Sequence, residues 1–265
     1  MFGRSYRSIG LLVCFFWPLV ISPAWSMEKP KESKAPKIEP QAAQVLKHMT
    51  EYLKGLQQFS VQAEIAEDVL LDSGLKIQDG RSVTASVRRP NRLRVDSLGD
   101  GGDRQLFYDG KTMTLMDLSN NVYSTIDVPR EIDAALNHTI KAYNLRAPLA
   151  DLIYANAYDY LMEGTLAGFY LGLSKVQGQL CHHLAFRQKE IDWQIWIENG
   201  PTPLPRKFLI TDKKAKGLQV TALLSQWNTS PQMEDSFFTF VVPEKAEKVN
   251  LRPVAAPVGP KKTKK

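Results

Sequence analysis

The sequence predicts a mainly β protein of the α+β class, an incomplete antiparallel β-barrel capped by an N-terminal amphipathic helix and by middle helices. Short segments in which apolar and polar residues alternate fill residues 82–129 and 165–242. Helical apolar spacing appears before the first of these stretches and again between the two. A chain with about ten consecutive strands favours a curled half-barrel, because long sheets curl and closure removes exposed edges.

The first expected element is an amphipathic helix that starts at Glu39 and ends between Gly55 and Gln58. Its apolar residues recur at spacings of three and four, and they are Val45, Leu46, Met49, Tyr52, Leu53, Leu56 and Phe59. A period-two strand is expected over residues 61–71. Ser73-Gly74 and Asp79-Gly80 are then expected to form turns that lead into the sheet.

Residues 82–129 are typical of an antiparallel meander with one dry face. Along its first strand the apolar residues Val83, Ala85 and Val87 alternate with Thr84, Ser86 and Arg88. Asp109-Gly110 and Asn120-Asn121 provide residues that tolerate the positive φ of hairpin turns. The dry face of such a sheet needs a cover.

Two middle helices and a second set of strands follow. The first helix opens at Pro129-Arg130-Glu131, and the second runs from Pro148 to about Tyr160. Strands resume at Thr165, and the segment FFTFVV at 237–242 is expected to be the last. Hairpin turns are expected at Gly178, Asn199-Gly200-Pro201 and Lys216-Gly217. Several late strands are apolar on both faces, so they are covered on both sides or line a cavity.

The two ends of the chain lie outside the expected domain. Arg4 and Arg7 precede an apolar run at 9–21 and a small-residue site at 24–26, which predicts a signal peptide over 1–26 and a periplasmic protein. A retained anchor is the alternative. Removing the two arginines lowers the formal charge from +6 to +4. Residues 27–38 are expected to form a flexible basic and Pro-rich linker, 39–252 the domain, and 253–265 a disordered basic tail, solvated rather than bound to nucleic acid.

The sequence offers little catalytic chemistry. No nucleophile elbow, zinc-protease helix, phosphate loop or dinucleotide fingerprint occurs. Cys181 is the only cysteine after the leader, so no intramolecular disulfide is expected. Cys181 and His183 share one face of a strand, but two ligands do not make a metal site. We therefore expect no enzyme, no metal and no cofactor; an enzymatic alternative rests on Cys181 with His183.

Short motifs give the chain a resemblance to known proteins. They are Val87-Arg88-Arg89-Pro90-Asn91-Arg92-Leu93, Asp109-Gly110-Lys111-Thr112-Met113, and Phe238-Thr239-Phe240 followed by Pro243. In order and spacing they resemble the periplasmic lipoprotein carriers of the LolA/LolB type, except that Thr114-Leu115-Met116 replaces a more aromatic strand. A closer similarity, to the predicted periplasmic proteins with domain of unknown function 2092, rests on Trp193-Gln194-Ile195-Trp196-Ile197 and Pro203-Leu204-Pro205-Arg206-Lys207.

The resemblance implies a curved, incomplete barrel whose open side is covered by helices and whose apolar cavity holds acyl chains. It also implies a role for Arg89, because the carriers have an arginine before proline that hydrogen-bonds to the helical lid and holds it shut. The alternative for Arg89 is an edge-strand arginine that faces solvent.

We therefore expect an exported, non-enzymatic carrier or chaperone that binds a lipid, an acyl chain or a lipoprotein anchor and touches the membrane transiently. The ligand contacts expected from the helix, the rim and the later strands are Met49, Leu53, Leu56, Arg89, Phe169, Trp193 and Trp196. The apolar stripe of the first helix is either a mobile lid or permanent core. The alternative function is an envelope interaction protein with a filled barrel and no ligand.

Overall fold

The computed structural model describes residues 37–143, 145 and 150–253. The predicted signal peptide, all but the last two residues of the predicted linker, and the predicted tail after residue 253 lie outside the described residues, so these predictions stay untested. The start expected for the second middle helix, Pro148, also falls outside them.

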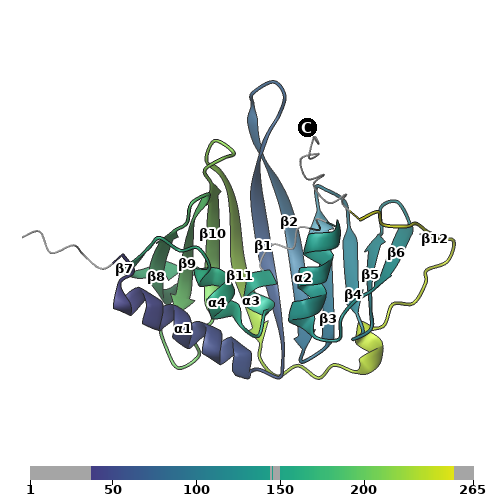
Figure 1. The fold of residues 1–265 in the computed structure, drawn as a ribbon, viewed down its shortest axis with the longest axis horizontal. Helices are drawn as coiled ribbons and strands as arrows, with labels where there is room; N and C mark the ends of the chain where they lie inside the picture. Colours follow the sequence, from purple (N-terminus) through teal and green to yellow (C-terminus); the bar gives the residue numbers. More distant parts are fainter. Residues whose placement is uncertain (1–36, 144, 146–149, 254–265) are drawn as a thin grey trace, which may run out of the picture. The chain divides into compact units, whose positions relative to one another are not determined.

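Twelve strands form one curved, open sheet (Figure 1). Along the chain they are β1 (Gln58–Leu70), β2 (Lys76–Arg88), β3 (Arg92–Gly99), β4 (Arg104–Tyr108), β5 (Thr112–Asp117), β6 (Val122–Asp127), β7 (Ala167–Val176), β8 (Gln179–Arg187), β9 (Ile191–Glu198), β10 (Pro205–Asp212), β11 (Leu218–Asn228) and β12 (Glu247–Lys248). Their order in the sheet is β12-β6-β5-β4-β3-β2-β1-β11-β10-β9-β8-β7. The predicted half-barrel is confirmed.

The pairing of β1 with β11 joins the two halves of the sheet. These strands are antiparallel, with Ala63 opposite Leu224 and Ile65 opposite Ala222. Every other neighbouring pair is a consecutive antiparallel hairpin except β12, which runs parallel to β6. A single long-range pairing therefore brings the meander beside the late strands.

Helices gather on one face of this sheet (Figure 1). They are α1 (Pro40–Gly55), α2 (Ile132–Tyr143), α3 (Ala150–Ile153) and α4 (Ala157–Met162). The predicted first helix is confirmed: Pro40, whose missing N–H costs nothing in the first turn, opens it. Its apolar face is buried against β7, β8, β9 and the short helices.

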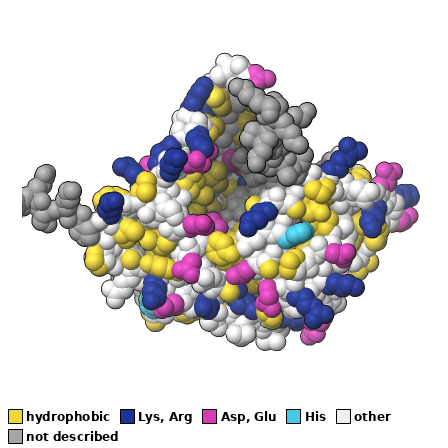
Figure 2. Space-filling model, in the orientation of Figure 1, with side chains coloured by type: hydrophobic (Ala, Val, Ile, Leu, Met, Phe, Trp, Pro, Cys, Tyr) yellow, Lys and Arg dark blue, Asp and Glu magenta, His cyan; other side chains and the backbone are white. Residues whose placement is uncertain are grey.

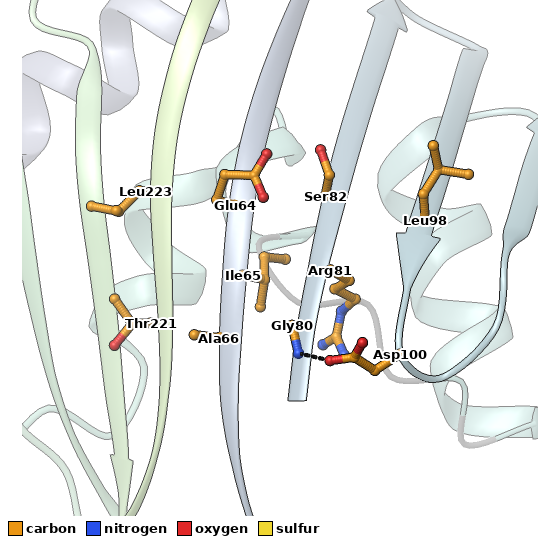
Figure 3. A pocket seen from close by; sticks show the side chains of 10 residues that line it. All are labelled: Glu64, Ile65, Ala66, Gly80, Arg81, Ser82, Leu98, Asp100, Thr221 and Leu223. Atoms are coloured by element: carbon orange, nitrogen blue, oxygen red, sulfur yellow. Dashed lines mark hydrogen bonds between the residues drawn. The ribbon is translucent and has the colours of Figure 1, made fainter. Parts of the chain in front are cut away.

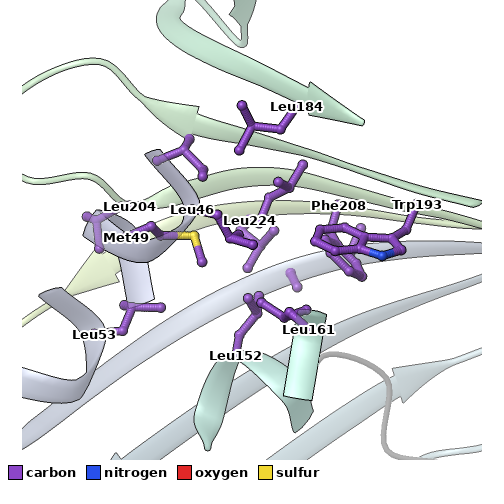
Figure 4. Packing of buried hydrophobic residues seen from close by; sticks show 14 of the residues in the cluster. Leu46, Met49, Leu53, Leu152, Leu161, Leu184, Trp193, Leu204, Phe208 and Leu224 are labelled. Carbon is purple, nitrogen blue, oxygen red and sulfur yellow. The ribbon is translucent and has the colours of Figure 1, made fainter. Parts of the chain in front are cut away.

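Two groups of buried side chains form the core between helices and sheet. The larger one combines Leu46, Met49 and Leu53 of α1 with residues of the late strands, among them Trp193 and Phe208 (Figure 4). The smaller one lies beneath α2 and consists of Phe59, Val87, Leu93, Tyr108, Met113, Ile132, Ala135, Leu136, Ala150, Tyr154 and Ala157. Each helix is thus held by an apolar face, which is where most helical stability in proteins comes from.

Some predicted elements are wrong. The segment FFTFVV is not a strand; it overlaps the 3₁₀ helix η1 (Asp235–Phe238). Its rings pack on arginines instead of joining a ladder, because the Arg94 guanidinium lies 4.7 Å from the Phe237 ring and the Arg88 guanidinium 5.2 Å from the Phe238 ring.

The turn at Asp79-Gly80 and the single second middle helix are also wrong. Asp79 lies inside β2, opposite Glu67, so the only turn between β1 and β2 is the one at Ser73-Gly74. The second middle helix is broken into α3 and α4, and Asn156 precedes α4 in a non-helical conformation. The strand β12 was not predicted at all.

Candidate functional site: a helix-covered apolar cavity

A cavity of about 620 Å³ lies on the helical side of the sheet. Side chains that alternate along β1, β2 and β3 form its wall, while β10, β11, α2 and α3 close its sides. Figure 2 shows a hollow whose floor is hydrophobic. Because side chains on a strand alternate between faces, the dry face predicted from Val83 and Ala85 is the wall of this cavity.

The character of the wall changes from one ladder row to the next. At one end, Phe59 and Leu93 are almost fully buried. A middle row of small and branched side chains follows, made by the successive ladder partners Val61, Ala85, Val95 and Leu106. At the other end Arg81 Nη2 donates to Glu67 Oε2 at 3.0 Å. The cavity therefore has an apolar inner end and a charged rim, as a site for an amphiphile requires.

The short helix α3 covers the cavity, and all four of its residues line it. Arg89 fastens this helix to the sheet, because its Nη2 donates to the Ile153 carbonyl oxygen at 2.8 Å. Asp133 of α2 holds the segment that follows α3, because both of its carboxylate oxygens accept the Ala155 N–H, at 3.0 and 3.1 Å. Two polar links thus hold α3 in place, one to the sheet and one to α2.

A side-chain network ties α4 to α2 as well. Asn137 Nδ2 donates to Tyr160 Oη at 2.7 Å, and Tyr154 Oη donates to Asn137 Oδ1 at 3.1 Å. The two tyrosine rings stack with centroids 4.1 Å apart. Burial, together with the nearby Asp151, raises the pKa of Tyr154, so its hydroxyl stays a donor. These contacts hold α4 and the residues after α3 against α2.

Two charged groups near the cover are incompletely compensated. Burial lowers the pKa of Arg89, Asp133 counteracts this, and Arg89 Nε has no hydrogen-bond partner. Asp151 of α3 lines the cavity, and burial raises the pKa of its carboxyl group. Within the described part of the chain, no hydrogen bond or ion pair involves the Asp151 side chain.

The structure separates the seven predicted contact residues into three groups. Met49, Leu53 and Trp193 are core, at most 2% exposed, and Leu56 packs between the two core groups. Phe169 is 42% exposed on the edge strand β7, and Trp196 is buried with Cys181 in a small group of its own. Arg89 holds α3. None of the seven is among the residues that line the cavity, so their contact with a ligand stays a prediction.

The residues that do line the cavity were largely missed. The signal for them was the alternation along the meander and its neighbours, notably Ala63, Val83, Ala85 and Val95. That pattern predicts a dry face, but it does not distinguish a face packed by side chains from one that borders a void. Trp227, whose ring lies 5.8 Å from that of Phe59, carried no signal at all.

A second depression, of about 440 Å³, lies on the opposite face of the same strands (Figure 3). Its lining includes Glu64, Ser82 and Thr221, which alternate with the cavity residues. The Gly80 N–H donates to Asp100 Oδ2 at 2.7 Å at its border (Figure 3). This open surface carries both polar and apolar side chains and lacks the apolar wall of the first cavity. We therefore place the candidate site in the helix-covered cavity.

Cys181 and His183 share a strand face as predicted, but both have structural partners. The Cys181 thiol is fully buried and burial raises its pKa, which disfavours the thiolate that binds metals. The His183 ring stacks on Trp196 at 4.1 Å, and its Nε2 lies 2.9 Å from Gln194 Oε1. Among the residues described here, no group of three His, Cys, Asp or Glu side chains could hold a metal ion.

With the cavity described, a comparison with protein families identifies the chain. The model of the predicted periplasmic protein family DUF2092 matches residues 42–252. The chain belongs to this family. The family and the periplasmic location predicted from the sequence are thereby confirmed. The match spans the sheet, the cavity and the described helices of this DUF2092 protein, apart from the first two residues of α1.

Several solved structures are similar at low identity. An uncharacterised conserved protein from Thermus thermophilus has a TM-score of 0.46 and 12% identity, over 79% of this chain and 99% of that one. Lipoprotein LppX from Mycobacterium tuberculosis has a TM-score of 0.47 and 13% identity, over 74% and 100%. A LolA superfamily protein from Nitrosomonas europaea has 0.40 and 12%, over 75% and 97%. At these values nothing about their ligands is carried over.

No curated protein matches the DUF2092 chain. Among the helices in the described ranges, none combines the length and the apolar character needed to cross a bilayer.

Proposed function

We propose that this DUF2092 protein binds one lipid, acyl chain or lipoprotein anchor in the helix-covered cavity and acts as a non-enzymatic carrier or chaperone in the periplasm. The observation that carries the proposal is the cavity itself. Its volume of about 620 Å³ lies within the roughly 300–1,000 Å³ that is typical of small-molecule sites. A void with this apolar wall is costly unless something fills it, because its lining loses contacts on one side.

The polarity of the cavity favours an amphiphile over a wholly apolar ligand. An apolar chain would lie along Val61, Ala85 and Val95 toward Phe59. Its polar end would lie near charged residues of the lining, which include Arg81, Glu67 and Asp151. Each methylene group transferred from water contributes about 0.8 kcal/mol. A chain of about ten carbons therefore gains about 8 kcal/mol, which is of the same order as the roughly 4–15 kcal/mol that association costs.

We propose that movement of the cover widens the entrance to the cavity, and α3 is the element that fits this role. It has four residues, too few to be stable as a helix without packing. Its link to the sheet is the Arg89 hydrogen bond to the Ile153 carbonyl oxygen. A hydrogen bond from a charged donor contributes about 1.5–3 kcal/mol, which is small enough to break during exchange. We propose Arg89 as the latch of this lid.

The decisive test is the content of the cavity in protein taken from its host. The protein would be purified from the periplasm without detergent and analysed by native mass spectrometry. We expect a mass increment that corresponds to one acyl-containing molecule per chain, which solvent extraction removes. Protein that carries no such molecule and binds no acyl probe after extraction would contradict the proposal.

A second candidate, docking of an envelope protein on the outer surface, is favoured by one observation. The edge strand β7 exposes Leu171 and Leu173, each more than half exposed. Edge strands with apolar side chains invite pairing with another chain. A photo-crosslinker at Leu171, with Leu75 of the β1–β2 hairpin as a control position, would trap a specific protein from the envelope if this second function holds.

A further inference from the structure

We infer that Asp151 selects cavity ligands whose head group donates hydrogen bonds, with a protonated amine as the preferred group. This inference rests on the proposed function, since it names the ligand class of the same cavity. A carboxyl group, that of Asp151, lies in the otherwise mainly apolar wall of the cavity. Asp151 lies between Ala150 and Leu152 on α3, and all three residues line the cavity.

The Asp151 side chain differs from its neighbours because it has no hydrogen-bond or ion-pair partner among the described residues. The other described carboxylates near the cavity are engaged: Asp133 accepts the Ala155 N–H twice, and Glu67 accepts from Arg81. Asp151 has no such contact among the described residues, and burial raises the pKa of its carboxyl group. Asp151 is partly exposed and lines the cavity, so its carboxyl group is accessible to a ligand. A carboxyl group in a cleft whose pKa is raised by burial is a candidate for ligand contact.

The charges around the cavity agree with a donor rather than an acceptor on the ligand. Arg89 does not line the cavity, although its Nε lacks a hydrogen-bond partner, and its Nη2 donates to the Ile153 carbonyl oxygen. Arg81 and Arg104 stand at the rim, and they are engaged with Glu67 and with the Gly101 carbonyl oxygen. The Asp151 carboxylate is therefore the charged group of the lining that is available to accept a hydrogen bond from a ligand. An ammonium or hydroxyl group beneath α3 would satisfy it.

The test compares three probes of equal chain length that differ only in the head group: dodecylamine, dodecanol and dodecanoate. Binding of each to the full chain is measured by displacement of a fluorescent acyl probe at neutral pH. We expect dodecylamine to bind about tenfold more tightly than dodecanoate, as expected for one charge-assisted hydrogen bond, with dodecanol in between. Asp151→Asn should remove this preference.

A matched control is Asp159→Asn, which changes an exposed aspartate of α4 that does not line the cavity. It should leave the preference intact. As a readout independent of ligand, Asp151→Leu should raise the stability of the ligand-free protein, because it removes a carboxyl group that lacks a partner. Unfolding in urea measures this change.

The outcomes separate the inference from the function on which it rests. If all three probes bind equally well and Asp151→Asn changes nothing, the selectivity assigned to Asp151 is wrong while the cavity function stands. Preference for dodecanoate that disappears in Arg104→Gln would equally overturn the inference. If no probe binds to any variant, the proposed function fails together with it.

Discussion

Replacing Ala85 by phenylalanine distinguishes an open cavity from a packed core. Ala85 lies in the middle row of the cavity wall and points toward its volume of about 620 Å³. Ala222 on β11 is the matched control, because it also faces the helices and is 2% exposed, but it is packed in the core beside Phe208 and does not line the cavity.

Only the substitution in the packed core should lower the stability of the protein. Adding a phenyl group to a filled core forces side chains off their rotamers and costs about 1–3 kcal/mol, so Ala222→Phe should be destabilised by at least that amount. In an open cavity the same ring gains contacts without displacing any atom. The free energy of unfolding of Ala85→Phe should therefore stay within about 0.5 kcal/mol of the original protein or rise above it.

Ligand affinity should fall in Ala85→Phe although its stability does not. A ring at residue 85 takes the place of about two or three methylene groups of a bound chain, which at about 0.8 kcal/mol each corresponds to a loss of about 2 kcal/mol, or roughly 30-fold in affinity. Urea unfolding and displacement of a fluorescent acyl probe measure the two quantities. Equal destabilisation of both variants would refute the reasoning, since it would mean that the space beside Ala85 is already filled.

Three further predictions concern the latch, a turn and the buried thiol. Arg89→Leu should release a bound acyl probe about tenfold faster in stopped-flow displacement, whereas Arg88→Leu, whose guanidinium contacts η1 residues, should not. Burial pushes the pKa of Asp109 up, but the N–H groups of Thr112 and Lys111 outweigh it and leave the pKa below its ordinary value of 3.8. The ionised Asp109 carboxylate therefore stabilises the fold above about pH 4, and this stabilisation is lost as the pH falls through the lowered pKa of the folded state. The difference in free energy of unfolding between the original protein and Asp109→Asn, measured in urea, should shrink below about pH 4. A difference that stays constant with pH would argue against this role. Cys181, buried and with a raised pKa, should be alkylated by iodoacetamide at pH 8 at least about 100-fold more slowly than in urea; equal rates would contradict its placement.

The sheet and the first helix were predictable because their signals are local. Alternation along Val83, Ala85 and Val87 reports which face of β2 is dry, and the spacing of Leu46, Met49 and Leu53 reports the buried face of α1. The turns at Asp109-Gly110 and Asn120-Asn121 were predictable because these residues tolerate positive φ, which Gly110 and Asn121 adopt.

The cavity was less predictable because its existence depends on non-local distances. Whether Ala85 borders a void or another side chain is decided by where α2 and α3 come to rest, and that depends on contacts such as Arg89 with Ile153 and Asp133 with Ala155. Large aromatic residues are typical ligand contacts in a sequence-based prediction, yet the Trp193 side chain packs in the core. The side chains that border the void are mostly small and aliphatic.

The strand predicted at FFTFVV failed for a related reason. Its apolar residues are typical of a strand, but its role is decided by the arginines of β2 and β3. Arg88 binds the Met233 carbonyl oxygen and the Asp235 carboxylate, and Arg94 stacks on Phe237. Partners that lie more than a hundred residues away leave no trace in a local pattern.

Quenching of Trp227 by a brominated fatty acid tests the central claim most directly. The Trp227 ring lines the cavity beside Phe59, so a brominated chain bound there should quench its fluorescence in a saturable way, with one fatty acid per chain. Trp227→Phe should abolish most of the quenching while displacement assays show that the fatty acid still binds. Absence of saturable quenching, or quenching that is unchanged in Trp227→Phe, would contradict a ligand-binding cavity at this place in the fold.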